Sequence, residues 1–162
     1  MDFIDQALEL EQKMKTHYKL LADHCSGNEG IRNILNMLGK DHDKHLAMFT
    51  KMQNEDCRQM TATDAFLKFK NFLREMKENK ASFSCDLDQI KLYEEALNLA
   101  ERKLNLYRES LEDLECETSR QVLEEIIREE QKQVYVLQDI IEMVTRPQTW
   151  IENAEFYHFD EY

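Results

Sequence analysis

The chain has 162 residues, enough for one domain with a single hydrophobic core. Gly (3) and Pro (1) are scarce while good helix formers are plentiful, so the composition predicts an all-α protein and argues against all-β and doubly wound α/β folds. Acidic residues outnumber basic ones 33 to 21, and the resulting net charge of −12 repels phosphate backbones and anionic lipid, so we expect no nucleic-acid or membrane partner.

Four long segments carry apolar residues three or four positions apart, the pattern of a helix that buries one face. In chain order they cover residues 2–25, 28–54, 87–114 and 119–145, and a short helix is expected from Thr63 to Met76. Short links make neighbouring helices antiparallel, whereas the connection over residues 55–86 is long enough to cross the bundle. The sequence therefore predicts a four-helix bundle over residues 1–146 with one long crossover, followed by a tail, 147–162.

Local signals support these boundaries. Ser-Gly-Asn at 26–28 separates the first two helices, and Pro147 ends the last one because proline cannot continue a helix. Thr118 with Gln121 is expected to cap the start of the fourth helix.

Each apolar stripe is interrupted near its middle. The interrupting residues are Glu11 in the first helix, His42 and His45 in the second, Ala100 in the third, and Glu130 and Gln133 in the fourth. Each fills the i+3 or i+4 slot between apolar neighbours, so each should point inward. Buried charges without partners cost several kcal/mol, so inward Glu and His side chains need an explanation.

The interruptions also repeat along the chain. The spacing from Glu11 to Tyr18 recurs as Ala100 to Tyr107, and His42-x-x-His45 recurs as Glu130-x-x-Gln133. The two helical hairpins therefore look like copies of one unit. Dimetal carboxylate bundles are built in this way, with one Glu from each of two helices and Glu-x-x-His from each of the other two.

On these residues the sequence resembles the rubrerythrin-related branch of the ferritin-like superfamily over nearly the whole chain. The matching stretches are LELEQKMKTHY, DHDKHLAMF, YEEALNLAERKLNLY, EEQKQVYVL and, most specific to that family, TRPQTWIENAEF after the fourth helix. The resemblance implies a ferritin-like four-helix bundle with a non-haem diiron site that handles peroxide or oxygen. Family members often add a rubredoxin domain, and no C-x-x-C pair of that kind occurs here.

The resemblance implies only part of that site. Glu11 matches the helix-one ligand, His45 the helix-two histidine and Glu130 the helix-four bridging carboxylate. His42 replaces the second bridging Glu, Ala100 the helix-three Glu and Gln133 the helix-four His. We therefore expect no intact diiron centre.

Three arrangements remain open for the site. Glu11, His42, His45 and Glu130 could hold a single iron, zinc or manganese ion. The same four groups could instead satisfy one another through hydrogen bonds and an ion pair, without any metal. A dimetal centre would need a further carboxylate such as Glu101.

Two classes of function follow from these arrangements. One is a non-haem iron oxidoreductase of the peroxidase type, which would need an electron-donor protein. The other is a non-catalytic bundle that binds at most one transition-metal ion, or a metal-free structural or interaction protein.

The charged residues Glu124, Glu125, Arg128 and Glu129 are expected on the solvated face of the fourth helix.

No apolar run approaches the ~20 residues of a membrane span, and no signal segment is apparent, so a cytoplasmic location is expected. Four cysteines without metal-site spacing suit reduced thiols. The aromatic tail after Pro147 is expected to pack on the bundle or on the partner subunit of a homodimer.

Overall fold

The structure is a computed structural model that describes residues 2–25, 28–54, 65–78 and 87–146. These residues form the α-helices α1 (Phe3–Asp23), α2 (Glu29–Gln53), α3 (Ala65–Glu78), α4 (Leu87–Ser110) and α5 (Glu117–Thr145), with one 3-10 turn, η1 (Leu111–Asp113). No strand occurs in this part of the chain. The predictions of an all-α bundle and of a short helix between the second and third long ones are confirmed.

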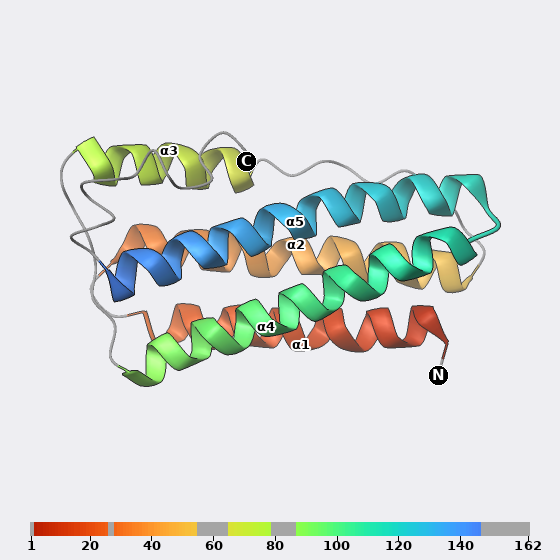
Figure 1. The fold of residues 1–162 in the computed structure, drawn as a ribbon, viewed down its shortest axis with the longest axis horizontal. Coiled ribbons are helices and arrows are strands. Elements are labelled where there is room, and N and C mark those ends of the chain that lie inside the picture. Colours follow the sequence, from red (N-terminus) through yellow and green to blue (C-terminus); the bar gives the residue numbers. More distant parts are fainter. Residues whose placement is uncertain (1, 26–27, 55–64, 79–86, 147–162) are drawn as a thin grey trace.

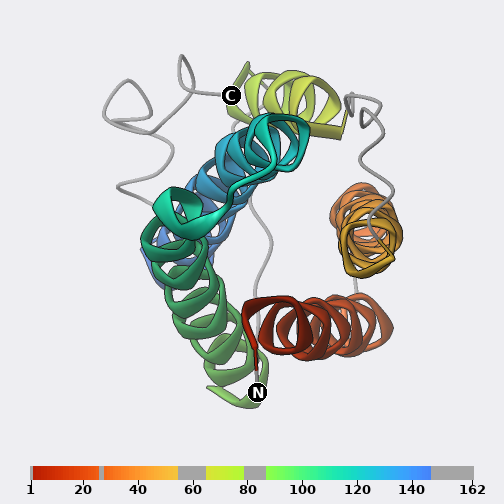
Figure 2. The ribbon, with the colours of Figure 1, turned by 90° about the vertical axis from the view of Figure 1, so that its right-hand side faces the viewer.

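The long helices form two antiparallel hairpins, α1 with α2 and α4 with α5 (Figure 1). α2 ends at one end of the bundle and α4 begins at the other, so the connection between the hairpins spans the length of the bundle (Figure 1). Seen end-on, the long helices follow one another around the core in the order α1, α2, α5, α4, and α3 lies outside them (Figure 2). The crossover predicted for residues 55–86 lies partly outside the described residues, and the positions of these two helix ends agree with it (Figure 1).

A side chain caps the N-terminus of each of the first two helices. Asp2 accepts a hydrogen bond from the backbone N–H of Asp5, and Asn28 accepts one from Ile31. The predicted cap at Thr118 is wrong, because the carbonyl of Cys116 already accepts from the backbone N–H of Arg120 and α5 begins two residues earlier.

The apolar core is divided along the helices into two clusters. The larger one contains Tyr18, Leu35, Leu73 and Leu137, and the smaller one contains Ala7, Phe49, Tyr107 and Ile126. Burying each large apolar side chain contributes about 1.5–3 kcal/mol, so both clusters stabilise the bundle. In sequence the polar interruptions lie between these two groups, as Glu11 lies between Ala7 and Met14.

α3 covers part of the bundle beside α2 and α5. Phe66, Phe69 and Leu73 are buried, as the apolar spacing of this segment predicts. The ring of Phe72 lies against Gly30, where a Cβ atom would collide with it. The missing side chain at Gly30 therefore lets α3 approach α2 closely.

Within the described ranges, no helix combines the length and the apolar character that a bilayer crossing needs. The division into a bundle and a tail stays a prediction, and the tail, 147–162, lies outside the described residues.

Candidate metal centre

Four buried side chains from three helices meet at mid-bundle: Glu11 from α1, His42 and His45 from α2, and Glu130 from α5. One potential ligand atom from each lies within 4.8 Å of all the others. His42 and His45 are three residues apart and so share a face of α2, which aims both rings at α1 and α5. The predicted convergence of these four residues is confirmed.

His42 is held by hydrogen bonds at both ring nitrogens. Its Nδ1 lies 2.6 Å from Glu11 Oε2, and its Nε2 lies 2.9 Å from Gln133 Oε1. The same amide oxygen accepts from the hydroxyl of Tyr18 at 3.0 Å, and the Tyr18 ring stacks on His42. Gln133 therefore orients His42 through its carbonyl oxygen, although it stands where the resemblance implies a histidine ligand.

His45 connects α2 to two adjacent carboxylates of α5. Its Nε2 lies 2.7 Å from Glu129 Oε2, while its Nδ1 lies 3.1 Å from Glu130 Oε1 and 3.3 Å from Glu11 Oε2. Burial alone would lower the pKa of His45, but the charge of Glu11 and the nearby carboxylates of Glu129 and Glu130 raise it well above its usual value. His45 is therefore set in a strongly negative surrounding.

Lys103 of α4, which the sequence reasoning missed, is fully buried in the same cluster. Its Nζ lies 2.8 Å from Glu130 Oε1, 3.2 Å from Glu11 Oε1 and 3.3 Å from His42 Nδ1. Although burial by itself would raise the pKa of Glu11, Lys103 and the two histidines hold it well below its usual value. The cluster therefore already contains one fixed positive charge.

Glu129 of α5 is buried, contrary to the prediction from the sequence. The sequence predicts Glu129 on the solvated face of the last helix, but Glu129 is only 6% exposed and contacts His45. It lies three residues after Ile126 and four before Gln133, both of them buried, so it stands at the edge of the inward face. The same spacing from inward-facing neighbours would have identified Lys103, which lies three residues after Ala100 and four before Tyr107.

The remaining positions on α4 provide no further metal ligand of the expected kind. Ala100 is buried and has no donor atom, and Glu101 is exposed, so the dimetal alternative through Glu101 is wrong. The hydroxyl of Tyr107 donates to Glu11 Oε1 at 2.5 Å. Burial and the charge of Glu11 raise the pKa of Tyr107 well above its usual value, so this hydroxyl keeps its proton.

Two atoms of the donor set have no hydrogen-bond partner among the described residues. These are His45 Nδ1, whose contacts to the carboxylates lack hydrogen-bond geometry, and Glu130 Oε2. Buried polar atoms are normally paired, so unpaired ones in a native cluster suggest an ion or a water molecule. The donor set thus fits a metal ion, with Lys103 Nζ close to the same carboxylates.

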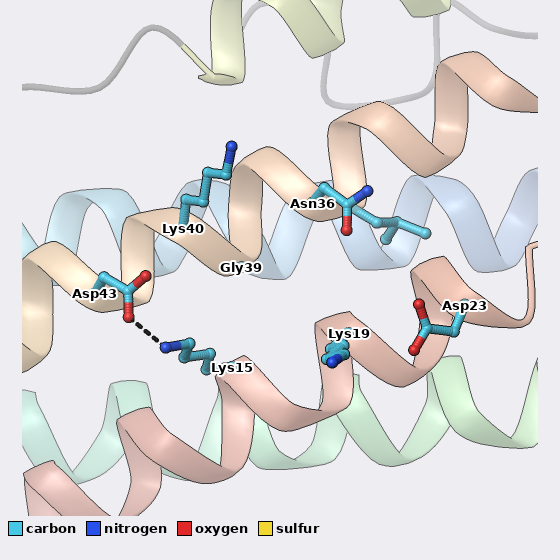
Figure 3. Close-up of a pocket in the computed structure, with 8 residues that line it drawn as sticks. Lys15, Lys19, Asp23, Asn36, Gly39, Lys40 and Asp43 are labelled. Atoms are coloured by element: carbon cyan, nitrogen blue, oxygen red, sulfur yellow. Dashed lines mark ion pairs between the residues drawn. The ribbon is translucent and has the colours of Figure 1, made fainter.

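A surface hollow of about 380 Å³ between α1 and α2 is a weaker candidate for binding (Figure 3). Lys15 is paired with Asp43 at 2.6 Å, and Lys40 points away from Lys19 (Figure 3). Because its charged groups do not converge on one point, the hollow has no arrangement that would hold a specific ligand.

The protein is thus an all-helical bundle with a buried Glu and His cluster of the kind that binds metal ions. Comparison with protein-family models, with curated proteins and with solved structures finds no match.

Proposed function

We propose that this protein is a ferritin-like, rubrerythrin-related bundle that binds one divalent transition-metal ion through Glu11, His42, His45 and Glu130. The single observation that carries the proposal is the buried donor set, in which His45 Nδ1 and Glu130 Oε2 lack hydrogen-bond partners among the described residues. The hairpin pairing and the long crossover support the ferritin-like part of the proposal.

The charges of the cluster favour a divalent ion. Glu11, Glu129 and Glu130 bring three carboxylates, and Lys103 brings one ammonium group. Histidines bind a metal ion in their neutral form, so two negative charges remain when an ion is bound, and a divalent cation balances them. Two imidazoles and two carboxylates suit zinc, iron(II) or manganese. Such an ion supplies Lewis acidity and, if it is iron or manganese, redox chemistry.

A diiron peroxidase is the less favoured alternative. Two-electron peroxide chemistry in the family that the sequence resembles uses two irons, and Ala100 offers no ligand for the second one. The oxygen of Gln133 is already engaged with His42 and Tyr18, and Lys103 adds a positive charge that a second ion would meet. The homodimer and an electron-donor partner stay predictions.

The proposal is tested by metal loading. Protein stripped with a chelator is dialysed against Zn²⁺, Mn²⁺ or, without oxygen, Fe²⁺, and the bound metal is measured by elemental analysis. We expect one bound ion per chain, lost in His45→Ala and retained in His24→Ala, a matched change at an exposed histidine at the end of α1. Circular dichroism checks that both variants are folded.

Three results would overturn the proposal. The first is a parent protein that takes up no ion. The second is equal metal loading of His45→Ala and His24→Ala. The third is two irons per chain with the absorption band of an oxo-bridged pair.

A further inference from the structure

Lys103 is the one buried cation in the described core that is neither a metal ligand nor explained by the proposed function. A lysine is rarely buried completely, because removing its ammonium group from water is costly unless charged partners replace the water. Here Glu130 Oε1, Glu11 Oε1 and His42 Nδ1 surround it within 3.3 Å, and the Tyr107 ring centre lies 6.0 Å away. The ammonium group thus faces two carboxylate oxygens, from Glu130 and Glu11, while the neighbouring His42 Nδ1 is already hydrogen-bonded to Glu11 Oε2.

These partners are also three of the four residues in the donor set of the proposed ion. We propose that Lys103 is a built-in counter-cation, which keeps the cluster folded without metal and competes with a divalent ion for Glu11 and Glu130. Two like charges among the same carboxylates repel each other strongly at the effective dielectric of a protein interior. Lys103 therefore determines how tightly the cluster binds metal, and this inference rests on the proposed metal site.

The proposal predicts opposite effects of one substitution in two conditions. Replacing Lys103 by Met keeps most of the side-chain volume and removes the charge. With a chelator present, Lys103→Met should melt at a lower temperature than the parent, because Glu11 and Glu130 lose their counter-charge. With Zn²⁺ present, the variant should gain more in melting temperature than the parent does, since a ligand stabilises the state that binds it more tightly.

The experiment measures thermal unfolding with EDTA and with Zn²⁺, and Zn²⁺ affinity by competition with a chromophoric chelator. Lys103→Met should bind Zn²⁺ at least tenfold more tightly than the parent. Lys91→Met is the matched control, since Lys91 is exposed on the same helix and twelve residues, about 18 Å, from Lys103. Lys103→Arg keeps the charge and should bind Zn²⁺ with the affinity of the parent, which separates the effect of the charge from that of packing. If Lys103→Met does not fold in EDTA, we expect it to fold when Zn²⁺ is added. The affinity measurement is then repeated with Lys103→Gln.

The outcomes distinguish this inference from the metal site itself. Equal Zn²⁺ affinity of the parent, Lys103→Met and Lys103→Gln would overturn the role of Lys103 while leaving the metal site intact. Tight binding by Lys103→Met and none by the parent would support the role of Lys103 and refute metal binding by the parent. Absence of binding in all variants would overturn both.

Discussion

Replacing Glu11 by Gln tests whether this carboxylate holds the buried cluster together. The change keeps the shape of the side chain and removes the negative charge that contacts Lys103, His42, His45 and the hydroxyl of Tyr107. In the variant, an amide N–H₂ group replaces a carboxylate oxygen. A donor then faces the donors that this oxygen accepted from in the parent.

The expected loss of stability is large because the Glu11 side chain is fully buried. A hydrogen bond to a charged group contributes about 1.5–3 kcal/mol, and removing one partner of a buried ion pair costs about 3–5 kcal/mol. These terms overlap, so we expect Glu11→Gln to lower the free energy of unfolding by about 3–5 kcal/mol in total. That is a substantial part of the ~5–15 kcal/mol that stabilises a typical domain.

The assay is urea unfolding followed by circular dichroism, with EDTA present so that metal does not contribute. Glu9→Gln is the matched control on the same helix, because Glu9 forms only an exposed ion pair with Lys13 at 2.6 Å. The control should leave the urea midpoint unchanged. A loss below about 1 kcal/mol for Glu11→Gln would refute the view that its charge stabilises the buried cluster.

Three further predictions follow from other contacts. Tyr107→Phe removes one hydrogen bond to the same carboxylate and should cost about 1.5–3 kcal/mol in urea unfolding. Gly30→Ala should destabilise the parent, because the new Cβ would collide with the ring of Phe72. In a Phe72→Leu background the same change should stabilise the protein by up to about 1 kcal/mol, since alanine has the higher helix propensity. A double-mutant cycle in urea measures both effects. Iodoacetamide should alkylate exposed Cys116 faster than Cys25, whose pKa is raised by burial, as peptide mass spectrometry resolves; equal rates would contradict the described burial.

The helices and most of the inward positions could be predicted from the sequence, because helical periodicity is a local property. The first two segments, predicted as 2–25 and 28–54, are Phe3–Asp23 and Glu29–Gln53. Glu11, His42, His45 and Glu130 could be identified for the same reason: each fills an apolar slot of its own helix, whatever the other helices do.

Only the tertiary structure decided the charge balance of the cluster. Lys103 and Glu129 lie where the inward face of a helix meets polar residues, and a side chain there turns inward only if a partner on another helix compensates its charge. The partners are distant in the chain: Lys103 pairs with Glu11 and Glu130, and Glu129 pairs with His45. Spacing within one helix predicts that a side chain can reach the core, but the packing of α1, α2, α4 and α5 determines which charges meet there.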